Sequence, residues 1–209
     1  MSESVISANN SVSSVVRSKV TRFKRGHVFT AKNLNIKGSH DAVLRSLSRL
    51  NADGVIKRIH KGVYYKPQIS TLFKGKPLPP DVGETVRVIA RANKEKIQVH
   101  GAVAANRLGL SNQVPVIKVF YTNGPAREMN VGGSRVKFVH TENKALFESK
   151  EPAIAMAVSA MHFLGKELVD AKVIEGIKSN LTEEQFEKLK TMKLTAWMKS
   201  ALTKECSYA

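Results

Sequence analysis

Residues 29–66 read FTAKNLNIKGSHDAVLRSLSRLNADGVIKRIHKGVYYK, and this stretch decides the fold. It predicts a short helix, a turn, an amphipathic second helix and a two-stranded hairpin. The second helix is expected over residues 39–53. Ser39 is a good N-cap, Asp41 lies in the first turn where the helix dipole favours an anion, and Gly54 is placed to end the helix.

The hydrophobic pattern of this stretch changes period at Gly54. Before it, apolar residues recur at three- and four-residue spacing and predict one buried helix face. After it the period is two, as in a strand, and Lys61 with Gly62 supplies a hairpin turn. The residues of the buried helix face are Val43, Leu44, Leu47 and Leu50.

The opposite helix face and the hairpin carry the positive charge. A helix of this size fits the major groove of duplex DNA, and a basic hairpin beside it can reach phosphates. The arrangement resembles the winged helix-turn-helix. We expect Arg45 and Arg49 to face bases and the hairpin to hold phosphates. The candidate DNA-binding residues are Thr30, Lys37, Ser39, His40, Arg45, Arg49, Lys57, Arg58, His60 and Lys61.

The charge of the chain is concentrated in its first third. The 209 residues carry a formal net charge of +17, which points to a polyanionic partner. Through Lys76, fifteen Lys and Arg stand against three acidic residues, a net of +12. The remaining 133 residues hold nineteen against fourteen, a net of +5. A generically basic surface would spread the charge more evenly, so we attribute the excess to the predicted DNA-binding region.

The cysteine content and the hydropathy of the sequence indicate in which cellular compartment the protein is expected. The single Cys206 cannot form an internal disulfide, which fits a reducing cytosol. The polar first residues lack the basic and apolar regions of a secretory signal, and no apolar run is long enough to span a membrane. We therefore expect a cytoplasmic protein without a membrane partner.

The whole chain predicts an α+β fold, with an N-terminal winged helix-turn-helix followed by a mixed α/β domain that has a small sheet and C-terminal helices. The expected domains are a disordered lead over 1–10, the winged helix over 11–66, a Pro-rich linker over 67–81 and the second domain over 82–209. The expected elements are helices over 11–25, 31–34, 82–96, 101–108, 152–164, 168–178, 182–190 and 191–203, and strands over 27–29, 97–99, 116–122, 127–131 and 134–140.

Known catalytic and cofactor motifs are missing from the sequence. It contains neither the G-x-x-x-x-G-K-[ST] nor the G-x-G-x-x-G phosphate-binding pattern. Its six histidines are scattered singly, without the spacing of metal ligands. We expect no cofactor, no metal and no enzymatic activity. The alternative is a nucleic-acid-modifying enzyme with its site in 82–165, around His100, Asn106 and the 123–127 turn. His100 is better explained as a capping or packing residue.

RNA binding through the same basic surface is a third possibility. Tyr64 and Tyr65 alternate with strand-forming residues and do not make the paired stacking platform of an RNA-binding sheet. Duplex DNA therefore ranks above RNA as the expected partner.

Residues 116–140, VIKVFYTNGPAREMNVGGSRVKFVH, follow the winged helix and the proline-bearing crossover. Together these parts resemble the AbiEi-type antitoxins of bacterial type IV toxin–antitoxin systems. The match lies in a strand that ends in a T-N-G-P turn, followed by a G-G hairpin and a basic strand, and it covers about residues 11–165. The matching residues are Thr122, Asn123, Gly124, Pro125, Gly132 and Gly133.

The resemblance implies a bacterial transcriptional autorepressor in phage defence, bound at its operator, with a homodimer expected by analogy. It also implies that the second domain counters a nucleotidyltransferase-like toxin. A free-standing regulator without a toxin is the alternative within the same fold.

Overall fold

The computed structural model describes residues 11–71, 75–112 and 117–204, so the lead expected over 1–10 and Cys206 lie outside the described residues. The chain forms two compact units. The first unit runs to Lys94 and takes in Val131–Gly133, and the second holds Glu95–Asn130 and the chain from Ser134 onward. The helix expected to open the second domain is therefore grouped with the first unit.

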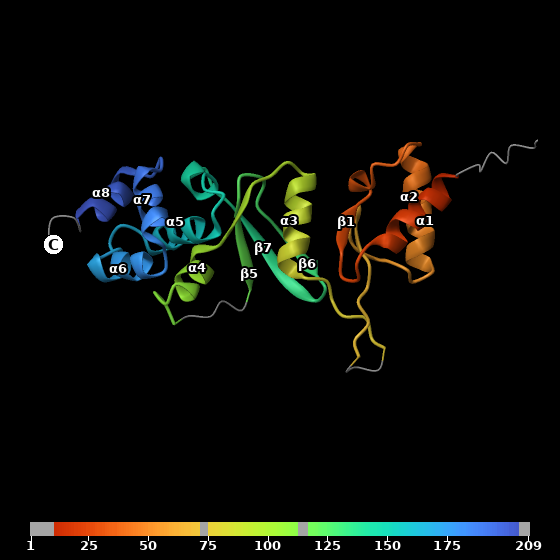
Figure 1. Ribbon diagram of the computed structural model, residues 1–209, viewed down its shortest axis with the longest axis horizontal. Coiled ribbons are helices and arrows are strands. Elements are labelled where there is room, and N and C mark those ends of the chain that lie inside the picture. The colour runs from red at the N-terminus through yellow and green to blue at the C-terminus, as the bar shows by residue number, and fades with distance from the viewer. Residues whose placement is uncertain (1–10, 72–74, 113–116, 205–209) are drawn as a thin grey trace, which may run out of the picture. The chain divides into compact units, whose positions relative to one another are not determined.

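The first unit has the chain order of a winged helix-turn-helix and is seen at the red-to-yellow end of the ribbon (Figure 1). Its three-stranded antiparallel sheet has the order β1-β3-β2. The predicted α+β fold class is thus confirmed. The elements are α1 (Val12–Arg22), β1 (Val28–Thr30), η1 (Lys32–Leu34), α2 (His40–Ala52), β2 (Lys57–His60), β3 (Val63–Tyr65) and α3 (Val82–Ala92).

Helix α2 forms where its caps and periodicity predict it. The Ser39 hydroxyl accepts a hydrogen bond from the Ala42 N–H at 3.2 Å, and Gly54 has φ +72°, the left-handed conformation that ends the helix. Val43, Leu47 and Leu50 are buried on the inward face. They join a core cluster with side chains of α1, β1, η1 and β3.

Helix α1 is shorter than the pattern predicted. It ends at Arg22, and Phe23 is already extended with φ −63° and ψ 143°. The Lys66 ammonium donates to the carbonyl oxygens of Thr21 and Phe23, at 2.6 and 2.9 Å, and so satisfies the end of the helix. The prediction that this helix reaches residue 25 was wrong, because this long-range contact could not be read from the local pattern.

Backbone hydrogen bonds hold the described residues of the crossover that follows β3. Ile69 and Pro77 form an isolated bridge, and the Leu78 N–H donates to the Gln68 carbonyl at 2.7 Å. Helix α3 follows and lies against β1. It ends at Ala92, short of residue 96, because Lys94 takes a left-handed φ of +59°.

The second unit contains a four-stranded mixed sheet of order β4-β5-β7-β6, in which β5 and β7 are parallel. Gly132 and Gly133, with φ +57° and +89°, make the predicted turn between β6 and β7. Residue 116, expected to begin β5, lies outside the described residues. The elements are β4 (Ile97–Val99), α4 (Gly101–Arg107), β5 (Lys118–Thr122), β6 (Arg127–Val131), β7 (Ser134–His140), η2 (Lys144–Phe147), α5 (Pro152–Leu164), α6 (Ala171–Ser179), α7 (Glu183–Thr191) and α8 (Ala196–Lys204).

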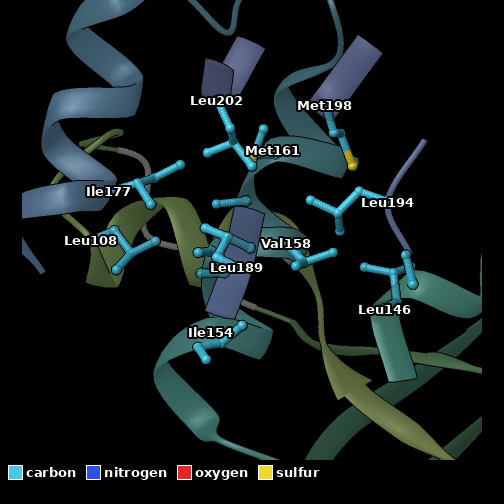
Figure 2. Close-up of a cluster of buried hydrophobic side chains, with 14 of the residues drawn as sticks. Leu108, Leu146, Ile154, Val158, Met161, Ile177, Leu189, Leu194, Met198 and Leu202 are labelled. Carbon is cyan, nitrogen blue, oxygen red and sulfur yellow. The ribbon is translucent and has the colours of Figure 1, made fainter. Parts of the chain in front are cut away.

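The C-terminal helices enclose the main core of the second unit (Figure 2). Met161 and Met198 are fully buried in it, and Trp197 packs at its edge. Two of the predicted helices begin later than expected. Helix α6 begins at Ala171 and not at residue 168, because Asp170 caps it, and α8 begins at Ala196 and not at residue 191. The labelled core residues are Leu108, Leu146, Ile154, Val158, Met161, Ile177, Leu189, Leu194, Met198 and Leu202.

Helices α4 and α5 approach closely at Gly101. This residue is buried, and a methyl group in its place would overlap the Cβ atom of Phe163 and the carbonyl oxygen of Ser159. The Ser159 hydroxyl donates to the Val99 carbonyl at 2.6 Å, which holds α5 to β4 next to this contact.

The variant Gly101→Ala should therefore lower the stability of the second unit by about 1–3 kcal/mol, the usual cost of overpacking. Gly83→Ala is the matched control. At that first-turn glycine of α3 the added methyl meets the flexible end of Arg87 at 3.2 Å, and removing a helical glycine stabilises by about 0.5–1 kcal/mol.

Urea unfolding measures both variants. Fluorescence of Trp197, the single tryptophan, follows the second unit, and circular dichroism follows both units. An unchanged midpoint for Gly101→Ala would contradict the close approach of the two helices.

Candidate nucleic-acid interface

The outward face of α2 carries the predicted base-reading side chains. His40, Arg45 and Arg49 are exposed and have no hydrogen-bond or ion-pair partner in the part of the chain that the structure describes. Arg45 and Arg49 lie on the side of the helix opposite the buried Leu47 and Leu50, and His40 is exposed at the first residue of the helix. Since these cations are not used to build the fold, they are available to a ligand.

The hairpin β2–β3, which we call the wing, adds a second group of cations. Lys57, Arg58, His60 and Lys61 are all exposed. Gly62, with φ +74°, makes the predicted turn at the tip. Lys57, His60 and Lys61 have no side-chain partner among residues 11–71, 75–112 and 117–204.

The wing is joined directly to the end of α2. The Leu50 carbonyl accepts hydrogen bonds from the N–H groups of Val55 at 3.0 Å and Ile56 at 3.3 Å. Ile56 is fully buried in the core cluster of the first unit. The helix face and the wing therefore belong to one packed frame.

Three predicted residues stand before α2 and differ in exposure. Lys37 and Ser39 are exposed, although the Ser39 hydroxyl is already used as the N-cap. Thr30 is only 4 % exposed, and its hydroxyl accepts from the Asn33 N–H at 3.2 Å. Thr30 holds η1 in place and offers no surface to a ligand in this conformation, so it is left out of the interface.

Three other cations of the first unit are used internally, whereas Arg22, Lys24, Arg25 and Lys32 are exposed. Arg17 pairs with Asp53 at 2.9 Å, and the Lys19 ammonium donates to the Leu34 carbonyl at 2.5 Å. Lys66 closes the end of α1. This separates cations that build the unit from those that α2 and the wing leave exposed.

Asn51 is a residue that the sequence analysis missed. Its side-chain Oδ1 accepts a hydrogen bond from the Arg58 N–H at 2.9 Å, which ties the last turn of α2 to β2. The only signal in the sequence is an amide side chain just before the helix-ending Gly54, and this does not identify the partner.

A cavity of about 550 Å³ lies elsewhere in the first unit. Lys24 and Arg25 line it from the segment after α1, and Asp81 and Glu84 line it from the start of α3. His27 Nδ1 lies 3.8 Å from a Glu84 carboxylate oxygen. Charges of both signs offset one another here, so this cavity does not suit a polyanion as α2 and the wing do.

The aromatic residues of the wing do not form a stacking surface. Tyr64 and Tyr65 are only 5 % and 6 % exposed, and Tyr64 belongs to the core cluster of the first unit. Recognition of unpaired bases by an RNA-binding sheet depends on exposed rings. The described wing therefore lacks the feature that would favour RNA.

The residues of the enzymatic alternative have structural partners. His100 Nδ1 accepts from the Ala102 N–H at 3.3 Å and caps α4, as expected for a capping histidine. Asn106 donates to the Ser111 carbonyl at 3.0 Å, and Asn123 Oδ1 accepts from the Lys96 N–H at 2.7 Å. The Arg127 guanidinium forms a two-pronged ion pair with Glu95. These contacts give each of the four residues a part in holding the fold.

Residues 15–189 match the sequence model of a family of unknown function, DUF6088. The chain belongs to this family. No curated protein and no solved structure matches it.

Neither a membrane-spanning helix nor a metal-binding cluster is found among the described residues of this DUF6088 protein. Its described helices are each too short or too polar to cross a membrane. Within the described residues, no three His, Cys, Asp or Glu side chains gather in a group that could hold a metal ion.

Two half-buried histidines give the second unit a predicted pH dependence. Burial lowers the pKa of His100, and nearby His162 lowers it further; burial also lowers the pKa of His162. A histidine whose folded pKa is depressed stabilises the fold above its unfolded value, near 6.5, and loses that contribution as the pH falls. The second unit should thus lose stability as the pH falls below about 6.5.

The variant His100→Asn keeps an N-capping acceptor but cannot titrate. We expect its urea midpoint, followed by Trp197 fluorescence, to vary less with pH than that of the natural protein. The pKa of His140 is shifted in the opposite direction, because its hydrogen bond to Glu142 raises it. The variant His140→Gln therefore serves as the control. Parallel curves for His100→Asn and the natural protein would argue against the expected contribution of His100.

Proposed function

We propose that this protein binds double-stranded DNA in a sequence-specific manner through α2 and the wing. One observation carries the proposal: exposed cations without internal partners gather on two elements that share one packed frame. In the described chain through Lys76 the acidic residues are Asp41 and Asp53, and Asp53 is paired with Arg17. The remaining positive charge of this region is therefore little compensated.

The shape of duplex DNA suggests which residues contact bases and which contact phosphates. An α-helix fits the major groove, where base edges differ in their donors and acceptors, and arginine can bond guanine through two atoms. Arg45 and Arg49 are assigned to bases, with Ser39 and His40 at the start of the helix. Lys57, Arg58, His60 and Lys61 are assigned to phosphates, which fix position without reading sequence.

We further propose that the protein is a bacterial autorepressor and the antitoxin of a type IV toxin–antitoxin system. The support is the AbiEi-type resemblance of the 122–133 region. In the structure, the Gly124 N–H donates to the Thr122 hydroxyl at 3.0 Å, and Gly132 and Gly133 form a tight turn. On this proposal the second unit counters a nucleotidyltransferase-like toxin, and the protein acts in the cytoplasm at its own operator as a homodimer.

The DNA proposal predicts different effects for two single substitutions. Arg45→Ala should reduce the preference for operator over random duplex by about 1–3 kcal/mol, because a base contact is lost. Lys61→Ala should weaken binding to both duplexes alike. Fluorescence anisotropy with the region upstream of the protein's own coding sequence measures both variants.

Salt provides the second measurement on the same samples. With about 6–10 phosphate contacts, affinity should fall by about 10³–10⁵ between 50 and 200 mM salt. Competition by RNA of the same length distinguishes the two nucleic acids. If Arg45→Ala kept full operator preference, α2 would not be the reading helix.

The antitoxin proposal predicts that DNA binding and toxin neutralisation separate. Full-length protein with Arg45→Ala and Lys61→Ala together should lose operator binding yet still relieve the growth arrest caused by a nucleotidyltransferase-like protein encoded beside it. Growth on co-expression and reporter repression are measured in parallel. Repression by the natural protein with no relief of growth arrest would identify a free-standing regulator.

A further inference from the structure

The wing depends on the side chain of Asn51 for one of its backbone hydrogen bonds. Strand β2 is at the edge of the sheet, with β3 on one side. The Arg58 N–H is satisfied by the Asn51 Oδ1, at 2.9 Å, so the last turn of α2 covers the edge of β2 at this point. This hydrogen bond is exposed, so an Arg58 N–H that lost the Asn51 side chain would bond to water, and the link between α2 and β2 would be lost.

The Arg58 side chain makes a second contact, closer to the tip of the wing. The pairing of β2 with β3 is regular at Arg58 and shifts register before His60. Across that irregularity the Arg58 Nε–H donates to the His60 carbonyl at 3.3 Å. An extra residue in one strand bends the strand and redirects its side chains. The guanidinium thus braces the bend that presents His60 and Lys61.

We propose that Asn51 and Arg58 are positioning residues, which set the wing cations at the distance from α2 that a duplex requires. The inference rests on the proposed DNA binding. Asn51 fixes the start of β2, and Arg58 fixes the bend before the tip. Arg58 has a second role besides the phosphate contact assigned to it, because its two terminal nitrogens remain available beyond the bonded Nε.

A change in positioning has a signature that a change in charge does not share. The logarithm of affinity falls with the logarithm of salt concentration by about 0.9 for each phosphate contact. Asn51→Ala removes no charge, and Arg58→Lys preserves one but loses the planar donor that reaches the His60 carbonyl. A smaller salt dependence in either variant must therefore come from wing cations that no longer reach phosphates.

The experiment measures duplex affinity from 50 to 300 mM salt for the full-length protein and its variants. For Asn51→Ala the slope should fall by about 2–3, as two or three of the four wing contacts are lost, and Arg58→Lys should lower it in the same direction. Lys61→Ala gives the reference for one lost charge, a fall of about 0.9. Asn33→Ala, an exposed asparagine in η1 outside α2 and the wing, should leave the slope unchanged.

Amide hydrogen exchange of the free protein provides a readout that is independent of DNA. The Arg58 amide should exchange faster in Asn51→Ala, while Asn51→Asp, which keeps the acceptor oxygen, should retain its protection. If Asn51→Ala fails to fold, the salt slope of Arg58→Lys decides the question. If the natural protein binds no duplex, the proposed function is overturned. The exchange rate of the Arg58 amide still tests whether Asn51 holds β2 in that case.

An unchanged salt slope in Asn51→Ala overturns the positioning role, as does unchanged protection of the Arg58 amide. A reduced slope with faster exchange supports it. A double-mutant cycle between Asn51→Ala and Lys61→Ala should be non-additive, because a displaced wing makes the lysine less important.

Discussion

The turn at Gly54 is the constraint on which the first unit depends. Its left-handed backbone ends α2 and lets the Leu50 carbonyl accept the N–H groups of Val55 and Ile56. Ile56 then enters the core, and the chain continues into β2. One glycine thereby sets both the length of the helix and the direction of the wing. A surface made by both elements can match a rigid partner because it needs little rearrangement.

The charges of the first unit have two distinct uses. Arg17, Lys19 and Lys66 bond to a carboxylate or to backbone carbonyls, whereas Arg45 and Lys61 point outward without such partners. Clustered charges of one sign repel one another and destabilise the compact state. Their accumulation on α2 and the wing is therefore a cost to folding that a polyanionic partner would offset.

Local signals predicted the parts of the fold that local chemistry controls. Ser39, Gly54 and Gly62 act within a few residues of themselves, and the helix and wing lie where they indicated. Burial of Thr30 results from pairing β1 with β3, and the bond between Asn51 and Arg58 joins two elements. The Arg127–Glu95 ion pair spans 32 residues. Such contacts depend on three-dimensional packing, so no periodicity or capping rule reveals them.

The extent of the family match bears on the role of the second unit. The match runs from α1 to α7 and so includes both units. A regulator that acted only by occupying an operator would need the first unit and a means of dimerising. A family defined by both units is better explained if DNA binding places the second unit where its own activity is required. On the proposed function, the close packing of α4 on α5 and the Arg127–Glu95 pair keep that unit rigid for a partner.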